Sequence, residues 1–310
     1  SSAFFDDHLS TGIHAMQDYQ DIWYTSTDGL ELYARDYNSG NGEGTPILCM
    51  HGLSRNSADF ETLAQVLSRK HRVIAVDQRG RGLSQWDTDT SHYTPVVYVQ
   101  DMWHLLDQLG VEAVIAIGTS MGGLMGMMMA AERPARIRGL VLNDVGPAVA
   151  AAGLQRIMSY VGKGNPVHCW DDAVAETRRL NEVCFPQYDD TDWKCMAQRM
   201  DRENQQGIPE LAYDPAISAP IDHDDSNLVP PDLWPLFEQL GQIPMLAIRG
   251  HLSDILSTET FTKMQRVLPH MLAVEVPNVG HAPALDEPAA LRAVISFVEQ
   301  PHSENTESIC

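Results

Sequence analysis

The sequence predicts an α/β protein with a mostly parallel β-sheet, helices on both faces of that sheet, and an inserted helical cap. Short apolar runs with the length of buried strands alternate with amphipathic helical segments along the first half of the chain. A middle stretch shows only helical periodicity, and the alternation then returns. Because parallel strands are joined by crossover helices that cover the sheet, this order favours one layered core interrupted by a cap.

The expected boundaries follow from these changes in pattern. Residues 1–20 show no clear period and are expected to form an N-terminal arm. Residues 21–145 and 241–300 are assigned to the core, and residues 146–240 to the helical cap. Residues 301–310 are polar and are expected to form a flexible tail. Two separate stretches of chain therefore build the core.

The first core stretch opens with a hairpin. Alternating residues flank the turn signal Thr27-Asp28-Gly29, which predicts two antiparallel strands within residues 22–37. The elements expected after it, in chain order, are a strand at 46–50, a helix at 58–70, a strand at 73–77, a helix at 98–110, a strand at 114–118, a helix at 121–132 and a strand at 139–144. The methionines of 121–132 are expected to pack in the core, because flexible thioethers fill irregular gaps.

The cap and the second core stretch complete the order. Residues 153–163 and 171–183 have helical patterns, and no buried strand run interrupts them. The core resumes with strands expected at 243–250 and 272–277, each followed by a helix, at 257–268 and 287–300.

Composition excludes several classes of partner. The formal net charge of −21 at pH 7 disfavours binding to the nucleic-acid backbone. No apolar run reaches the ~18 residues of a membrane-spanning helix, and the first residues lack the order of a secretory signal. We therefore expect a cytoplasmic protein that acts on a small molecule, with no nucleic acid or membrane as partner. The pattern leaves the oligomeric state open.

No metal or cofactor is expected. The five cysteines form no CxxC pair and are odd in number, which is typical of free thiols. Neither HExxH nor paired Cys and His spacing occurs. The glycine-rich segment DQRGRGLS follows a strand but lacks the order of either common nucleotide-binding motif. Arg79 and Arg81 in this segment are expected to form local ion pairs, with anion recognition as the alternative.

Ser120 is the strongest candidate for a nucleophile. It lies in Gly118-Thr-Ser-Met-Gly122, between an apolar strand and a helix. This is the G-x-S-x-G pattern in the context that it requires, because a sharp strand-to-helix turn exposes the hydroxyl and only small neighbours allow the two elements to pass. A helix-capping serine is the alternative, although capping alone does not explain glycines on both sides.

A serine nucleophile needs a base and an acid. His281 lies between Gly280 and Ala282 in a loop after an expected strand, which makes it the best-placed histidine. For the acid we favour Asp254, in the loop after strand 243–250, because Ser257 is better placed to cap the next helix. Asp144 also ends a strand on the same side of the sheet and remains the competing candidate.

Acyl transfer also needs oxyanion donors and a pocket. The backbone N–H groups of Leu53 and Met121 are expected to supply the donors, and His51 is expected to brace the loop of Leu53 by hydrogen bonds. Apolar and aromatic side chains in and near the cap are candidates for binding a moderately apolar substrate. They are Met158, Tyr160, Trp170, Phe185, Tyr188, Trp193 and Trp234.

The ordered motifs HGLSRN, DQRGRGLS, GTSMGG, LVLNDVGP, SDILS and VGHAP resemble those of the α/β-hydrolase superfamily. The chain is most similar to its capped bacterial serine hydrolases, which include carboxylesterases, lactonases and C–C bond hydrolases. The resemblance implies an eight-stranded type of sheet, a Ser120–Asp254–His281 triad, and oxyanion donors at Leu53 and Met121. Related epoxide hydrolases and haloalkane dehalogenases carry aspartate at the position of Ser120, so the resemblance argues against those activities.

The expected function is hydrolysis of small to medium carboxylic esters through an acyl-enzyme intermediate, without a cofactor. The alternatives are a lactonase or a C–C bond hydrolase for ring-fission diketones, both with the same triad. A ligand sensor with slow or absent turnover is the alternative outside enzymology, and the complete Ser, Asp and His set weighs against it.

Overall fold

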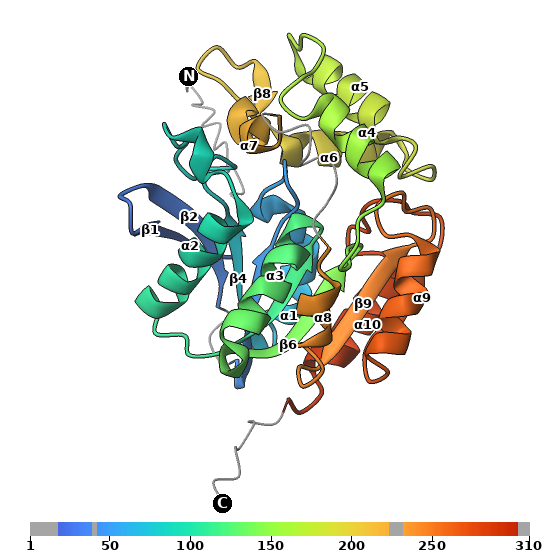
Figure 1. Cartoon of the computed structure of the whole chain (residues 1–310). Helices are drawn as coiled ribbons and strands as arrows, with labels where there is room; N and C mark the ends of the chain where they lie inside the picture. The colour runs from blue at the N-terminus through green and yellow to red at the C-terminus, as the bar shows by residue number, and fades with distance from the viewer. Residues whose placement is uncertain (1–17, 39–41, 223–231, 303–310) are drawn as a thin grey trace, which may run out of the picture.

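A computed structural model describes residues 18–38, 42–222 and 232–302 (Figure 1). Most of the expected N-terminal arm and C-terminal tail lies outside the described residues. In Figure 1 a layered core occupies the lower part of the molecule and a smaller group of helices lies above it. No helix in the described ranges has both the length and the apolar character needed to cross a bilayer.

An eight-stranded sheet forms the centre of the core. The first two strands pair as the antiparallel hairpin expected around Gly29, and β2 pairs antiparallel with β4. All other neighbours in this sheet are parallel. Across the sheet the strands are β1 (Gln20–Thr25), β2 (Glu31–Tyr37), β4 (His71–Asp77), β3 (Gly44–Met50), β5 (Val114–Thr119), β6 (Ile137–Asn143), β9 (Met245–Gly250) and β10 (Leu272–Val276).

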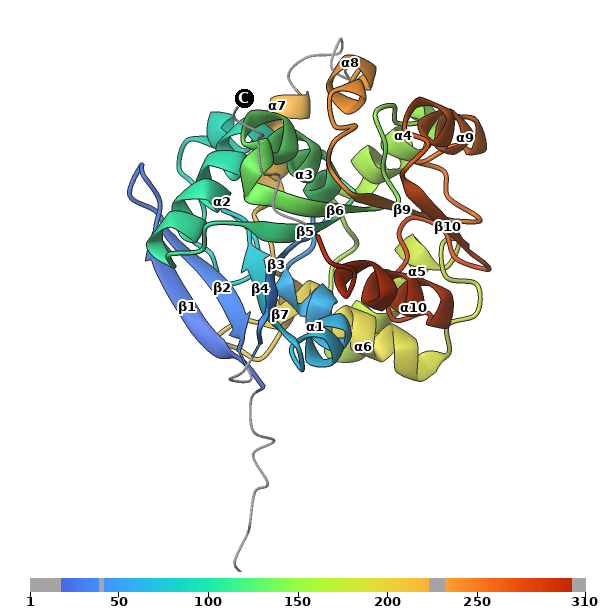
Figure 2. The ribbon, with the colours of Figure 1, turned by 90° about the horizontal axis from the view of Figure 1, so that it is seen from below.

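Helices cover both faces of the sheet, as Figure 2 shows along its edge. One face packs against α1 (Glu61–Leu67) and α10 (Pro288–Val298). The other packs against α2 (Pro95–Gln108), α3 (Met121–Glu132), α8 (Trp234–Glu238) and α9 (Thr258–Val267). Short 3₁₀ turns lie at η1 (Ser57–Phe60), η2 (Thr90–His92) and η3 (Pro134–Arg136). The predicted mostly parallel, helix-covered sheet is therefore confirmed.

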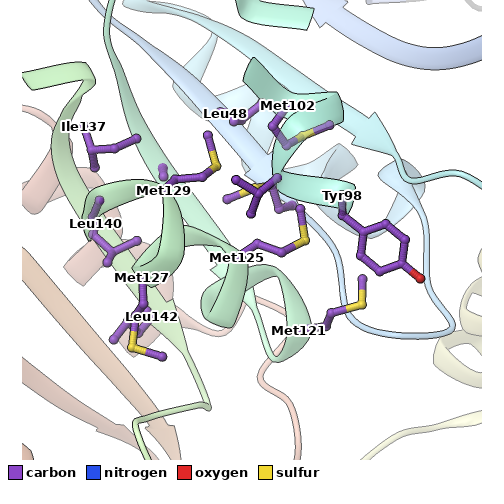
Figure 3. Packing of buried hydrophobic residues seen from close by; sticks show 14 of the residues in the cluster. Leu48, Tyr98, Met102, Met121, Met125, Met127, Met129, Ile137, Leu140 and Leu142 are labelled. Atoms are coloured by element: carbon purple, nitrogen blue, oxygen red, sulfur yellow. The ribbon is translucent and has the colours of Figure 1, made fainter. Parts of the chain in front are cut away.

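The methionines of α3 pack in the core, as the sequence predicts. Met125, Met127 and Met129 are fully buried. Figure 3 shows them between side chains such as Met102 and Leu140, which come from α2 and β6. This dense packing fixes α3, and with it the residue that precedes the helix.

The elements expected to form the cap lie between β6 and β9 in the chain. They include α4 (Ala151–Tyr160), α5 (Trp170–Asn181), α6 (Asp190–Met200), the hairpin β7 (Asp201–Glu203) with β8 (Pro209–Leu211), η4 (Pro215–Ser218) and α7 (Ala219–Asp222). The short exposed hairpin has no counterpart in the sequence prediction. The helix α8, which falls inside the expected cap range, packs on α3 and belongs to the core layer.

Candidate active site

Ser120 sits on a sharp turn between β5 and α3. Its backbone has φ 53° and ψ −115°, a strained conformation for a residue with a side chain. A Cβ atom on Gly118 would meet the backbone of Gly122, and a Cβ atom on Gly122 would meet the carbonyl oxygen of Met50. The two glycines are therefore required by close backbone contact, and the strand-to-helix turn predicted from the motif is confirmed.

His281 joins the serine hydroxyl to a carboxylate. Its Nε2 lies 2.9 Å from Ser120 Oγ, and its Nδ1 lies 2.7 Å from Asp144 Oδ2. An ionised carboxylate only accepts hydrogen bonds, so Nδ1–H donates to Asp144 and Nε2 is free to accept the serine proton. The loop after β10 thus brings the predicted base to the predicted nucleophile.

Asp144 is held by the surrounding backbone and by a serine. Its side chain is fully buried. Oδ1 accepts the N–H of Gly250 at 2.8 Å, and Oδ2 also accepts the hydroxyl of Ser253 at 2.6 Å. The residue has φ 57°, which a short polar side chain tolerates better than most. These contacts fix the orientation of the carboxylate toward His281.

Asp254 is not the carboxylate that contacts His281, so its predicted place in the triad is wrong. Arg156 in α4 donates from Nε to Asp254 Oδ2 and, at 3.0 Å, from Nη2 to Oδ1. Burial is the largest single influence and raises the pKa of the Asp254 carboxyl, but the hydrogen bonding and the charge of Arg156, with a smaller effect of His281, together keep the pKa below its usual value. The competing candidate, Asp144, follows β6, which is the immediate neighbour of the nucleophile's strand.

The predicted oxyanion donors flank the serine. Met121 is the first residue of α3, where backbone N–H groups have no acceptor within the helix. Leu53 lines the same cavity as Ser120, and a Cβ atom on the adjacent Gly52 would lie 3.8 Å from Ser120 Cβ. Both peptide segments therefore lie next to the serine.

His51 braces the loop of Leu53, as predicted. Its Nε2 accepts the N–H of Gln78 at 3.0 Å, and its Nδ1 lies 2.7 Å from the carbonyl oxygen of Gly52. The first contact requires an unprotonated Nε2, so Nδ1–H is the donor to Gly52. Burial lowers the pKa of His51 to about 3, with a smaller contribution from the charge of Arg81. The residue is a neutral structural hydrogen-bonding group.

A cavity of about 260 Å³ opens in front of Ser120 and His281. Three of the predicted substrate-binding residues line it: Tyr160, Phe185 and Tyr188. The rings of Phe185 and Tyr188 stack with their centroids 4.5 Å apart. Side chains from the segment between β6 and β9 therefore form an aromatic wall beside Ser120 and His281.

The other four predicted pocket residues do not line this cavity. Met158 is buried, and Trp193 lies edge-on to Tyr188 with 2% of its surface exposed. Trp170 donates its Nε1–H to Glu203 at 2.6 Å. Trp234 packs edge-on against Phe237 in α8. These side chains stabilise the cap and core instead.

The cavity also has polar lining that the sequence analysis missed. The lining includes Arg55, Asp59, Asn181, Asp192, Arg199 and Asp286. Arg55 is held by two hydrogen bonds to Asp59, of 2.8 and 2.6 Å. Among the described residues, the ion pair of Arg199 is a long one, 4.0 Å, with Glu61. Arg55 lies in the loop before η1, and its i, i+4 spacing to Asp59 gives no sign of a cavity.

A second cavity of about 620 Å³ adjoins the first. Ser54 and Tyr160 line both cavities, so Tyr160 lies between the triad chamber and this larger space. Its other walls come mainly from α5 and the β7–β8 hairpin.

One acidic cluster resembles a metal site but already holds a cation. Asp28, Asp87 and His92 place ligand atoms within 4.8 Å of one another. The guanidinium of Arg79 donates to Asp28 and Asp87, each at 2.7 Å, and to Asp101 at 2.7 Å. The ion pairs predicted for Arg79 are confirmed, and its side chain supplies the positive charge of the cluster.

Comparison with known proteins identifies the class. Residues 45–162 match the family described as the alpha/beta hydrolase fold. The chain is 35% identical over 274 residues to the 3-hydroxybutyrate-oligomer hydrolase of Cupriavidus necator, covering 86% of this chain and 93% of that protein. Together with the sheet order and the strand-to-helix serine turn, this similarity shows that the chain belongs to the α/β-hydrolase superfamily.

Further relatives share the fold. An alpha/beta hydrolase from Novosphingobium aromaticivorans superposes with a TM-score of 0.86 at 42% identity, over 92% of this chain and 99% of that one. The 2-(acetamidomethylene)succinate hydrolase of Mesorhizobium japonicum is 27% identical over 83% of this chain and 89% of its own. The relatives are hydrolases with different named substrates, and the chain is accordingly a hydrolase.

Proposed function

We propose that the protein hydrolyses carboxylic esters through an acyl-enzyme on Ser120. The observation that carries the proposal is the continuous contact from Ser120 Oγ through His281 to the buried Asp144, with distances of 2.9 and 2.7 Å. A serine hydroxyl becomes a good nucleophile when a correctly oriented imidazole accepts its proton.

The reaction follows from this geometry. His281 Nε2 takes the proton of Ser120 as Oγ attacks the acyl carbon, and the carbonyl oxygen becomes an oxyanion that accepts the N–H groups of Leu53 and Met121. Asp144 stabilises the imidazolium. The imidazolium then protonates the departing alcohol, which leaves the acyl-enzyme. Water, deprotonated by the same histidine, attacks the acyl carbon and releases the acid and free Ser120.

The cavity offers one contact for an apolar part of an ester and one for an anionic end. Phe185 and Tyr188 offer an apolar wall, while the guanidinium of Arg199 has no short ion pair in the described chain. Arginine suits recognition of carboxylates. The name of the Cupriavidus necator relative points to oligoesters of a hydroxy acid, which carry a free carboxylate at one end. We therefore propose short 3-hydroxybutyrate oligomers as the first natural substrates to assay.

A substrate panel tests the proposed reaction. We expect purified protein to turn over p-nitrophenyl butyrate and 3-hydroxybutyrate dimer and trimer, measured by p-nitrophenol release and by chromatography of the acids. A yellow ring-fission diketone and a lactone are assayed in parallel as substrates of the two alternative activities. Turnover of the diketone with no ester cleavage would contradict the ester assignment.

Replacement of Arg199 by Gln tests whether Arg199 binds the carboxylate end of the substrate. We expect the KM for the 3-hydroxybutyrate dimer to rise by about 10-fold, because a charge-assisted hydrogen bond contributes ~1.5 kcal/mol more than a neutral alternative. The KM for the methyl ester of the same dimer, which lacks the charge, will change by less than about twofold. Arg202, which lines the neighbouring cavity, provides the matched Arg202→Gln control. An equal rise for charged and neutral substrates would refute carboxylate recognition by Arg199.

A further inference from the structure

Arg81 is a fully buried arginine whose hydrogen-bond partners are uncharged. Its Nε donates to the carbonyl oxygen of Leu53 at 2.8 Å, and its Nη1 donates to the hydroxyl of Tyr98 at 2.8 Å and the carbonyl oxygen of Arg79 at 3.0 Å. The guanidinium carbon lies 4.7 Å from the centre of the Tyr98 ring. Aromatic and carbonyl groups therefore surround the charge.

Arg81 differs from Arg79, two residues earlier. Arg79 pairs with three carboxylates, whereas within the described ranges no carboxylate oxygen lies within 4.0 Å of the Arg81 guanidinium nitrogens. The local ion pair expected for Arg81 from the sequence is therefore wrong. A buried charge without a counterion destabilises a protein, so a positive charge kept in this place calls for another explanation.

The guanidinium contacts both residues that we assign as oxyanion donors. Besides the carbonyl oxygen of Leu53, its Nη2 reaches Met121 Sδ at 3.8 Å. Figure 3 shows the Met121 side chain at the start of α3, on the side where Tyr98 lies. One rigid side chain thus connects the loop after β3 with the first residue of α3, and these two segments are otherwise separate in the chain.

The charge also acts on this loop electrostatically. His51 lies in this loop, between β3 and Gly52. Burial lowers the pKa of His51 most, and the positive charge of Arg81 lowers this pKa further. A cation that acts on this loop also favours a negative charge that develops in front of it, and the interaction is stronger in a dry site than in water.

We propose that Arg81 is a positioning residue of the oxyanion hole, which joins the Leu53 and Met121 segments and places an unpaired positive charge behind their N–H groups. The inference rests on the proposed ester hydrolysis. In that reaction the oxyanion carries its full charge only near the tetrahedral state. Arg81 therefore stabilises the transition state more than the bound ester, and its loss lowers kcat rather than raising KM.

Three variants test the proposal with p-nitrophenyl butyrate and with phenylboronic acid. Ser120 Oγ adds to the trigonal boron, His281 takes the hydroxyl proton, and the boron becomes a negatively charged tetrahedral centre. For Arg81→Gln, which keeps hydrogen-bond donors but no charge, we expect kcat to fall about 10- to 100-fold with KM within about threefold. The Kd of phenylboronic acid will rise by at least about 10-fold.

The conservative variant separates charge from packing. Arg81→Lys keeps the positive charge, and we expect it to recover at least half of the loss in kcat on a logarithmic scale, together with boronic acid affinity. Tyr98→Phe removes only the hydroxyl that accepts from Nη1. Tyr98→Phe replaces Arg81→Gln in the test if the latter does not fold. For Tyr98→Phe we expect kcat to fall by about threefold to 10-fold at unchanged KM.

The outcomes separate this inference from the proposed function. If wild-type protein cleaves no ester, the proposed function fails. If wild-type protein cleaves esters but Arg81→Gln leaves both kcat and the affinity for boronic acid unchanged, only the inference about Arg81 is overturned. If Arg81→Gln does not fold, the same result for Tyr98→Phe overturns it. A loss of kcat with unchanged boronic acid affinity, or an equal loss in Arg81→Lys, also overturns it, because a merely structural role does not discriminate by charge.

Discussion

Replacement of Asp144 by Asn will lower kcat for ester hydrolysis by about 10³- to 10⁴-fold, a loss of the size expected when the acid of a Ser-His-Asp triad becomes an amide. The amide at position 144 keeps the volume of the carboxylate but presents N–H to His281 Nδ1, which in the native protein donates to Asp144 Oδ2. The imidazole then carries its proton on Nε2 and cannot accept the proton of Ser120. Steady-state kinetics with p-nitrophenyl butyrate will measure the loss.

Asp254→Asn is the matched control, because the same chemical change is made at the aspartate that the sequence favoured. The carboxylate of Asp254 is 36% exposed and pairs with Arg156, so its loss weakens a contact between cap and core and leaves the Ser120–His281 contact intact. We expect kcat within about threefold of wild type, since partly exposed ion pairs contribute ~0–1 kcal/mol. If Asp254→Asn loses as much activity as Asp144→Asn, the assignment of the acid is wrong.

The sequence could not decide between these two aspartates because the decision depends on contacts that are distant in the chain. Asp144 directly follows β6 and Asp254 lies in the loop after β9, so both come after the carboxyl ends of neighbouring parallel strands, as the sequence predicts. Asp254 is engaged by Arg156, which lies in the cap helix α4 and 98 residues away. Asp144 is oriented by Gly250, the last residue of β9, and by Ser253 in the loop after it. No local spacing reports which carboxylate a distant arginine will bind.

The nucleophile and the base were predictable because their requirements are local. Backbone contacts within one turn and with the adjacent strand β3 require glycine on both sides of Ser120. These glycines are visible in the sequence as the G-x-S-x-G motif. The alternation of strands and helices likewise records burial on the two faces of a parallel sheet. These patterns are sufficient to place Ser120 and His281 at one edge of that sheet.

The cavity wall was predicted only in part because helical periodicity shows that a cap residue is buried, not what covers it. Tyr188 lies in the loop before α6 and Trp193 in the first turns of that helix, yet Tyr188 lines the cavity while Trp193 is buried against the Tyr188 ring. Arg199 ends up in the same cavity because α6 crosses near η1 and α1, where Asn56 donates to the carbonyl oxygen of Arg199 at 2.8 Å. Such packing between cap and core is set by the tertiary fold.

Replacement of Ser120 by Ala will have the largest effect, a loss of about 10⁴- to 10⁶-fold in kcat, because it removes the hydroxyl that contacts His281 Nε2. Alanine keeps the Cβ atom, and the hydroxyl that it removes contacts His281, so the fold and the cavity wall should be retained. Hydrolysis of p-nitrophenyl butyrate measures the loss. Mass spectrometry after treatment with a fluorophosphonate, in which Ser120 Oγ displaces fluoride from phosphorus, will show one adduct on wild-type protein and none on the variant.

Ser257→Ala is the control for removal of a serine hydroxyl elsewhere. Ser257 caps α9, where its Oγ accepts the N–H of Thr260 at 3.0 Å. Loss of such a cap typically costs ~1 kcal/mol of stability, so we expect a lower Tm with unchanged kcat and full fluorophosphonate labelling. Substantial ester hydrolysis by purified Ser120→Ala protein, or labelling of that variant at another residue with the same rate, would refute the acyl-enzyme on Ser120. The contrast between the two serines isolates the chemical role of the hydroxyl of Ser120. Both substitutions remove a serine Oγ, and of these two atoms only Ser120 Oγ contacts the imidazole of His281.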